Sequence, residues 1–362
     1  MLSADLKETF LSLVRLGIGH GATPQLCSVD WTSVKKLADR HGLSAVVLDG
    51  LNEVLESNYR LSSLNSQFKL SWIGEVMQSY EVRYQSYEKA ISSFAGWHNS
   101  HGFKMMVLKG YACALYWPKP NHRPCGDIDI WQFGEQKEAD VALAKEKDIK
   151  IDSSHHHHTV YAWNGFTVEN HYDFLNVHHH KSNVELESIL KELGKDDSNY
   201  VELYGEKVFM PSPNLHALFL LRHSMSNFAS TGMRLRQLLD WAFLIESQGK
   251  DINWKWLEKQ LDYFGMKKLY DAFNVICVED LGFDVKLFPQ VQFQPELKDR
   301  VLNDILTPEF SEKESGGFVS RAVFKYRRWK ANKWKHELCF NDSLWSAFWS
   351  GVWGHLMKPG MI

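Results

Sequence analysis

The sequence predicts an α+β fold, in which a small mixed-sheet core lies between helical N- and C-terminal regions. Apolar residues recur at helical spacing in the first hundred residues and again after about residue 211. Between them lie alternating, strand-like stretches that include an Asn-Gly turn. We therefore expect a helical region over 1–102, an α/β core over 103–210 and a helical region over 211–362.

The N-terminal region is helical by periodicity. Leu6, Phe10 and Leu13 are three or four residues apart, and a long periodic stretch runs from Leu64 to Trp97. Both patterns place apolar side chains along one face of a helix.

Strand character begins after Lys104. Residues 105–108 form a short apolar run that ends at Lys109 and Gly110, and residues 127–133 alternate with period two. The most specific local signal follows at Asn164-Gly165, a pair typical of a two-residue type I′ hairpin.

That turn fixes a register. With Asn164-Gly165 as the pivot, strand alternation places one set of side chains on an apolar face and another on a polar face. The apolar face carries Trp163, Tyr161, Phe166, Val168 and Tyr172. The polar face carries His156, His158, Glu169, His171 and Asp173.

The C-terminal region returns to helical periodicity over residues 215–228 and 234–245, whereas residues 178–183 suggest a loop. A segment over 321–353 mixes basic and aromatic side chains. We favour packing of this segment on the N-terminal helices. Contact with nucleic acid or with a peripheral anionic membrane surface is the alternative.

Composition limits the function classes. The 41 basic residues nearly balance the 44 acidic ones, so no global field favours a nucleic-acid substrate. An acidic N-terminus and the lack of a long apolar stretch predict a cytoplasmic protein without a transmembrane segment. The 5 cysteines have no paired spacing, which argues against disulfides or a thiolate zinc site.

Asp127 and Asp129 are the first candidate site residues. Alternate residues of a strand share a face, so these two carboxylates project together while Ile128 and Ile130 point into the core. Adjacent carboxylates repel each other unless a hard cation lies between them, and magnesium fits that need. The alternative is an exposed acidic strand edge, which Asp-x-Asp by itself does not exclude.

Upstream features add to this pattern. Gly110 follows a strand, where a glycine lets the backbone approach a phosphate at the start of the next helix. Lys109 and Arg123 supply cations that could meet a triphosphate. Strand, glycine turn, helix and a strand with Asp-x-Asp is the order used by the nucleotidyltransferase superfamily typified by polymerase beta.

The chain resembles one branch of that superfamily, a poorly characterised bacterial nucleotidyltransferase-like family with a Leu-Lys-Gly turn followed by Arg-x-x-Gly-Asp-Ile-Asp. The matching residues here are Leu108-Lys109-Gly110 and Arg123-Pro124-Cys125-Gly126-Asp127-Ile128-Asp129. The resemblance continues through residues 168–171 and 232–241. The chain departs from better-known superfamily members at Lys109, where they carry a second small residue.

This resemblance implies transfer of a nucleoside monophosphate from a nucleoside triphosphate such as ATP, with Mg²⁺ or Mn²⁺ held by Asp127 and Asp129. It also implies nucleotide contacts from Lys109, Gly110, Arg123 and Gly126. A helix pair would close over the nucleotide with Arg236 or Arg234 facing phosphate. The alternative for Arg236 is an intrahelical ion pair with Asp240.

The superfamily needs a third carboxylate, on a neighbouring strand, to bind the metal and help deprotonate the acceptor. Glu169 is our candidate because the hairpin register places it on the polar face, and Asp173 is the fallback. His156, His158 and His171 should line the same cleft. They could bind zinc or another transition metal, contact substrate phosphate, or simply face solvent.

The resulting hypothesis is a metal-dependent nucleotidyltransferase whose acceptor, a small molecule, a sugar or a protein side chain, bears a hydroxyl. A nucleotide-binding or regulatory module without turnover is the first alternative. A histidine-rich metal-binding protein is the second.

Overall fold

The computed structural model describes residues 2–26, 28–57, 61, 63–155, 157–177, 180–292, 294–310 and 317–343. The chain divides into two compact units. The first, here called the helical unit, lies within residues 1–76, 221–246 and 254–341. The second, the sheet unit, lies within 77–220, 247–253 and 342–362. Each unit draws on separate parts of the chain, and the predicted boundaries at residues 102 and 210 stay a prediction.

The helical unit contains no strand among its described residues. Polar side chains cap the first two helices of this unit: Ser3 accepts a hydrogen bond from the backbone N–H of Leu6, and Asp30 accepts one from Ser33. The helices are α1 (Ala4–Gly17), α2 (Trp31–His41), α3 (Ser44–Glu56), α4 (Ser66–Val76), α10 (Leu235–Gln248), α11 (Trp254–Tyr263), α12 (Lys267–Glu279), α13 (Pro295–Leu306), α14 (Phe318–Ala331) and α15 (Lys333–Cys339). Helix α9 (Pro213–Ala229) begins in the sheet unit and ends in the helical unit.

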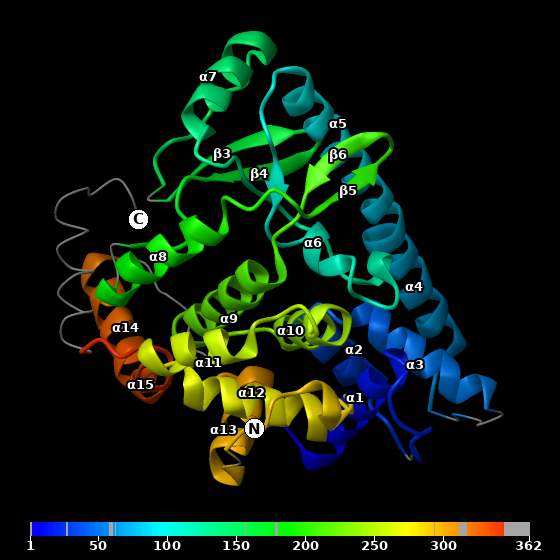
Figure 1. The fold of residues 1–362 in the computed structure, drawn as a ribbon. Coiled ribbons are helices and arrows are strands. Elements are labelled where there is room, and N and C mark those ends of the chain that lie inside the picture. The colour runs from blue at the N-terminus through cyan, green and yellow to red at the C-terminus, as the bar shows by residue number, and fades with distance from the viewer. Residues whose placement is uncertain are drawn as a thin grey trace. The chain divides into compact units, whose positions relative to one another are not determined.

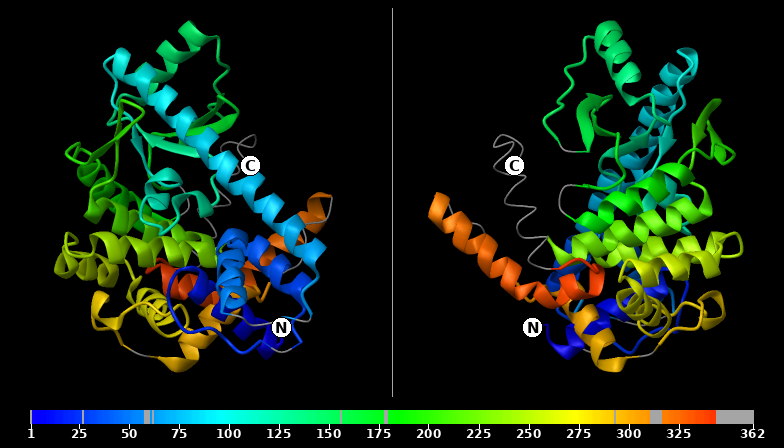
Figure 2. Two further views of the ribbon diagram at one scale, coloured as in Figure 1. Left: turned by 90° about the vertical axis from the view of Figure 1, so that its right-hand side faces the viewer. Right: turned by 60° about the vertical axis from the view of Figure 1, so that its left-hand side comes forward.

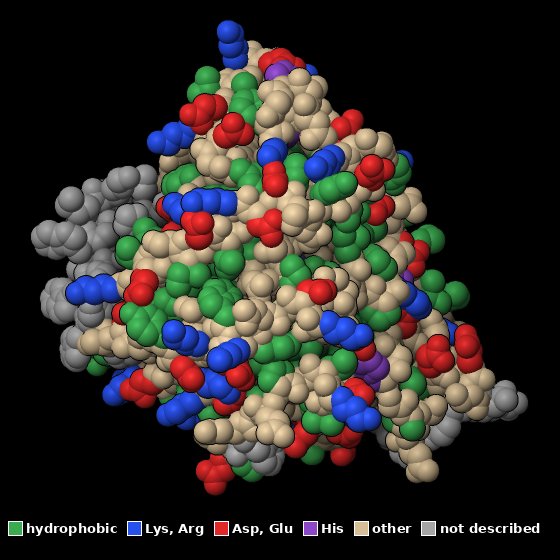
Figure 3. Space-filling view, in the orientation of Figure 1, with side chains coloured by type: hydrophobic (Ala, Val, Ile, Leu, Met, Phe, Trp, Pro, Cys, Tyr) green, Lys and Arg blue, Asp and Glu red, His purple; other side chains and the backbone are tan. Residues whose placement is uncertain are grey.

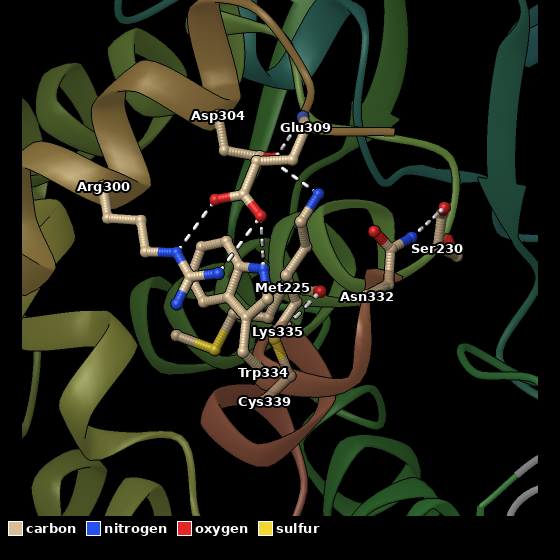
Figure 4. Close-up of polar contacts among 9 residues, drawn as sticks. All are labelled: Met225, Ser230, Arg300, Asp304, Glu309, Asn332, Trp334, Lys335 and Cys339. Carbon is tan, nitrogen blue, oxygen red and sulfur yellow. Dashed lines mark hydrogen bonds and ion pairs between the residues drawn. The ribbon is translucent and has the colours of Figure 1, made fainter. Parts of the chain in front are cut away.

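A buried ion pair fixes the end of the helical unit (Figure 4). The Lys335 ammonium lies 2.6 Å from the Asp304 carboxylate, and both side chains are almost fully buried. Beside it the Arg300 guanidinium lies 3.9 Å from the centre of the Trp334 ring and 2.8 Å from Glu309. Two members of the basic and aromatic segment are therefore packed against α13 and its C-terminal loop. Residues 344–353 of that segment lie outside the described residues.

The sheet unit contains a mixed sheet of six strands in the order β3-β4-β2-β1-β6-β5 (Figure 1). The pairs β2/β4 and β1/β6 are parallel, and the other neighbours are antiparallel. The α+β class predicted from the sequence is confirmed. The strands are β1 (Met106–Val107), β2 (Ile128–Trp131), β3 (His158–Trp163), β4 (Phe166–His171), β5 (Tyr200–Leu203) and β6 (Glu206–Phe209). The helices of this unit are α5 (Arg83–Ser100), α6 (Tyr111–Ala114), α7 (Gln136–Lys147) and α8 (Lys181–Leu193).

Helix α5 covers one face of the sheet, and Figure 2 shows it crossing the strands. Its buried side chains, Tyr87, Ile91 and Phe94, belong to the same apolar core as Ile130 and Val168 from the central strands. This burial leaves the alternate side chains of β2 and β4 on the opposite face. The candidate functional site lies on that face.

The β3/β4 hairpin has the predicted register. Trp163 pairs with Phe166, and His158 pairs with His171. Both turn residues have positive φ, 46° at Asn164 and 82° at Gly165, as a type I′ turn requires. The predicted separation of an apolar face from a polar face follows from this register, because Tyr161, Phe166 and Val168 are all buried in the α5 core.

One local prediction was wrong. The sequence suggested a loop over residues 178–183, but α8 begins at Lys181, and residues 178 and 179 lie outside the described residues. The residue before α8 is His180, whose side chain makes no capping hydrogen bond to this helix. A helix start without a capping residue gives no signal in the sequence.

The surface agrees with the nearly balanced charge. On the face drawn in Figure 3, acidic and basic side chains are interspersed. Among the described residues, every helix is too short or too polar to cross a membrane.

Candidate metal and nucleotide site

The site is centred on two carboxylates that come from neighbouring parallel strands. Asp129 of β2 and Glu169 of β4 are direct register partners. One ligand atom each from Asp129, Glu169 and His171 lie within 4.8 Å of one another. A parallel pairing in this register places the two carboxylates on the same face of the sheet, away from the α5 core.

Asp129 is held by a lysine and a histidine. The Lys109 ammonium lies 2.6 Å from its Oδ1, and His171 Nε2 lies 3.0 Å from the same oxygen. Burial by itself would raise the pKa of Asp129, but the charge of Lys109 and the hydrogen bond from His171 lower that pKa well below its usual range. Asp129 is therefore a permanently ionised, buried carboxylate.

The same contacts shift the pKa values of His171 and Glu169. Burial opposes the charged form of His171, but hydrogen bonds to Asp129 and Glu169 outweigh it, and the pKa of His171 is raised. The hydrogen bond from His171 is the largest influence on Glu169 and lowers the pKa of that carboxyl. His171 Nδ1 lies 3.3 Å from the Asp173 carbonyl oxygen, which fixes the orientation of the ring.

Asp127 lies at the edge of this arrangement. It immediately precedes β2 and has an exposed side chain. Its carbonyl oxygen accepts a hydrogen bond of 2.7 Å from the Tyr87 hydroxyl. Desolvation and then the charge of Asp129 raise the pKa of the Asp127 carboxyl. The structure therefore gives the two predicted aspartates different environments, one buried and paired and one facing outward.

The turn at Lys109-Gly110 brings the lysine to the carboxylates. Gly110 has φ +54° and ψ −102°, a combination that a residue with a Cβ avoids. A Cβ at this position would lie 2.4 Å from the Tyr87 hydroxyl oxygen. Only glycine fits here, and the turn leads directly into α6, which begins at Tyr111 as the predicted strand, glycine turn and helix order required.

A second cluster adjoins the carboxylates. Ligand nitrogens of His157, His158 and His171 lie within 4.8 Å of one another. Burial lowers the pKa of His157 far below its usual range and that of His158 to about 4, so both rings are neutral near pH 7. The predicted cleft residue His156 lies outside the described residues.

The other predicted site residues are placed as follows. Arg123 is buried and donates a hydrogen bond of 3.3 Å to the Pro124 carbonyl. Gly126 is exposed beside Asp127. Asp173, the fallback carboxylate, forms an ion pair with Lys191 of α8. Arg236 belongs to α10 of the helical unit, and its contact with phosphate stays a prediction.

Two contributors were missed from the sequence. Strand parity selected His156 and His158, but β3 begins only at His158, and His157 lies in the bend before it, where alternation no longer applies. Tyr87 contacts both Gly110 and Asp127, yet it lies 40 residues before Asp127 on the buried side of α5. No local pattern could have identified it.

The carboxylates fit a hard divalent cation. Asp129 and Glu169 present oxygen ligands within 4.8 Å of each other, and Asp127 adds an exposed carboxylate two residues away along the chain. The Lys109 ammonium adds a positive charge suited to phosphate oxygen. A cation, carboxylates and a lysine are the elements that phosphoryl and nucleotidyl transfer use.

Comparison with known proteins shows what the chain is similar to. A family model described as "Uncharacterised nucleotidyltransferase" matches residues 28–281. A solved structure described as an antigenic nucleotidyltransferase-like protein from Paracoccidioides brasiliensis is 18% identical, with a TM-score of 0.33, over 45% of this chain and 76% of that one. No curated protein matches.

Proposed function

The chain belongs to this uncharacterised nucleotidyltransferase family, and we propose that it moves a nucleoside monophosphate from a nucleoside triphosphate to a hydroxyl acceptor with the help of Mg²⁺ or Mn²⁺. Family membership supports nucleotidyl transfer in general. The metal, the donor and the acceptor are part of the proposal.

One observation carries it. Two carboxylates that are 40 positions apart in the sequence become register partners on parallel strands, and a largely buried lysine reaches Asp129 from a glycine turn. A purely structural ion pair would need one carboxylate and one cation. The additional Glu169 carboxylate, 3.6 Å from His171, keeps about a quarter of its side-chain surface exposed. An acidic site open to solvent is what a metal-bound phosphate substrate requires.

Asp127, Asp129 and Glu169 would hold the cation. When bound, Mg²⁺ would neutralise phosphate charge and lower the pKa of the acceptor hydroxyl. The chain's own groups support this arrangement, because Lys109 and His171 keep Asp129 ionised. Gly110 allows the backbone at the turn to lie close to Tyr87 and hence close to Asp127.

The proposed reaction forms a bond between the acceptor oxygen and the α-phosphorus and breaks the bond from the α-phosphorus to the bridging oxygen. Pyrophosphate leaves with that oxygen. We assign the acceptor's proton to Glu169, since its lowered pKa keeps it ionised and its side chain remains accessible. The role of general base contributes about 100-fold or more in comparable enzymes.

The experiment is release of pyrophosphate from each nucleoside triphosphate, with candidate acceptors, by the purified chain. We expect Asp127→Asn, Asp129→Asn and Glu169→Gln each to lower turnover by about 100-fold or more, while circular dichroism shows the fold intact. Asp173→Asn is the matched control, since that carboxylate pairs with Lys191 and should be dispensable. Normal turnover in Glu169→Gln together with loss of turnover in Asp173→Asn would assign the role of the third carboxylate to Asp173.

A second function is favoured by one observation. The Lys109 ammonium already neutralises the charge of Asp129 that a metal ion would otherwise balance. This favours a nucleotide-binding module that has kept the fold without turnover. Equilibrium binding of triphosphate without pyrophosphate release, across all nucleotides and with every acceptor tried, would establish that alternative.

A further inference from the structure

Three imidazoles meet at the polar end of the β3/β4 hairpin, beside the carboxylates Asp129 and Glu169. We propose that His157, His158 and His171 form a binding site for a divalent transition-metal ion of the zinc type. Their ligand nitrogens lie within 4.8 Å of one another. This inference goes beyond the proposed transfer reaction and does not depend on it.

The fold builds this cluster from the hairpin register. His158 is the direct cross-strand partner of His171. The His157 carbonyl oxygen accepts hydrogen bonds of 3.1 and 3.2 Å from the backbone N–H groups of Tyr172 and Asp173. These bonds hold the bend before β3 against the end of β4, and the His157 ring centre lies 5.6 Å from that of His171. A run of histidines in a flexible tag has no such fixed backbone.

One ring nitrogen each of His157 and His158 is available for a ligand. His157 Nδ1 and His158 Nδ1 are buried and have no hydrogen-bond partner. Buried polar atoms of this kind are uncommon in folded proteins and call for an explanation, of which an ion is one. A metal placed among these rings would explain both atoms together.

His171 shows the support that metal-binding histidines usually have. Its Nδ1 faces the Asp173 carbonyl oxygen at 3.3 Å, so a metal would bind Nε2 and replace the proton that Nε2 shares with Asp129 at 3.0 Å. A ligating histidine commonly donates its second ring N–H to a backbone carbonyl, which fixes the tautomer and the ring orientation.

The chemistry selects a transition metal over magnesium. Imidazole suits zinc, copper, nickel and iron, whereas magnesium prefers oxygen ligands. Three histidines with a fourth position open to water or another ligand is an established arrangement for zinc. The cluster is therefore a nitrogen site next to an oxygen site, and the two share His171.

The test uses Co²⁺ as a coloured substitute for Zn²⁺ on chelator-stripped protein. We expect one equivalent to bind, with visible d–d absorption, and the signal to persist in excess Mg²⁺ and to disappear on addition of Zn²⁺. His157→Gln and His158→Gln should each weaken binding by about tenfold or more. Glu169→Gln should leave the spectrum in place, because the carboxylate is outside this cluster.

His155→Gln is the matched control, since it removes a histidine of the same run that is partly exposed and lies 3.8 Å from Asp152. Equal losses in His155→Gln and His157→Gln would show unspecific chelation by the run and overturn the proposal. Absence of stoichiometric Co²⁺ binding, or loss of the signal in Glu169→Gln, would also overturn it. Should a histidine variant fail to fold, the wild type can be treated with diethyl pyrocarbonate and the modified residues mapped by mass spectrometry. Protection of His157 and His158 by Zn²⁺ would support the proposal, and modification unchanged by Zn²⁺ would overturn it.

Discussion

At the scale of single residues, the buried Lys109 and Asp129 pair is the feature that shapes the site. Each charge would be costly to bury without the other. His171 adds a hydrogen bond to the same Asp129 oxygen. The pair therefore serves both stability and the proposed chemistry, and substitution of Lys109 should affect both.

We predict that Lys109→Met destabilises the sheet unit by about 3 kcal/mol, because it leaves a buried carboxylate with one partner fewer. Urea unfolding measures the change. Lys104→Met is the matched control: its ion pair with Asp197 is about half exposed and should contribute at most about 1 kcal/mol. Equal losses of unfolding free energy in the two variants would show that the Lys109 pair contributes no more than an exposed ion pair. Weaker triphosphate binding in Lys109→Met, with the fold retained, would support its predicted nucleotide contact.

The residues that carry the site were predictable only where local pattern determines them. Asp129 and Glu169 followed from a strand motif and from a hairpin register. The ion pair between Lys109 and Asp129 did not, because it depends on how a positive-φ turn at Gly110 aims a flexible side chain. His157 was missed because β3 begins at His158, so strand alternation does not apply to the bend that contains His157.

At the scale of elements, the β3/β4 hairpin positions Glu169, His158 and His171 together. A slip of one residue would turn all three side chains to the apolar face. The turn that prevents this slip depends on Gly165, whose φ of +82° is unfavourable for a β-branched residue.

Gly165→Val should therefore destabilise the chain by about 1–2 kcal/mol, as measured by urea unfolding. Gly74→Ala is a useful comparison, because Gly74 lies within α4 and a Cβ there would meet nothing within 4 Å. That substitution should stabilise by about 0.4–1 kcal/mol. If Gly165→Val were as well tolerated as Gly74→Ala, the turn would not be what fixes the register.

Elements with strong local signals were predicted, and those without them were not. The Asn164-Gly165 pair revealed β3 and β4, and periodicity revealed the helical stretch that contains α4 and α5. The hairpin of β5 and β6 turns at Tyr204-Gly205, with φ of 50° and 84°. Tyrosine rarely occupies the first position of such a turn, so no turn motif indicated this hairpin.

At the scale of the whole molecule, acid should weaken the helical unit through His41. Its ring is buried, and its Nδ1 accepts a hydrogen bond of 3.2 Å from the Leu235 backbone N–H. Burial lowers the pKa of His41 from 6.5 to about 4. The unfolded chain therefore binds this proton more readily, and stability present above pH 6.5 is lost as the pH falls toward 4.

Over that interval the loss from His41 alone amounts to roughly 3 kcal/mol. The measurement is the free energy of unfolding from urea titrations between pH 7 and 4, for the wild type and His41→Gln. We expect the variant to be less stable at pH 7 and to have the shallower pH dependence. Parallel curves would show that His41 is not protonated on unfolding.

The assembly of the units could not be predicted from the sequence, since it depends on contacts between distant segments. The helical unit combines residues near the N-terminus with residues beyond 254, and its ion pair between Asp304 and Lys335 joins two late helices. Composition changes near residues 102 and 210 record changes of secondary structure. They contain no information about which helices pack together.

Because each unit is built from separate parts of the chain, neither can be isolated as a simple fragment. A fragment cut to residues 103–210 would omit α5, whose Ile91 and Phe94 share the sheet core, and would leave Ile130 and Val168 open to water. A fragment that ended at residue 281, where the family match ends, would separate α13 and α15 from the rest of the helical unit. Neither unit is one continuous stretch of coding sequence, so deletion mapping would confuse loss of folding with loss of function, and single substitutions in the intact chain are the appropriate genetic approach.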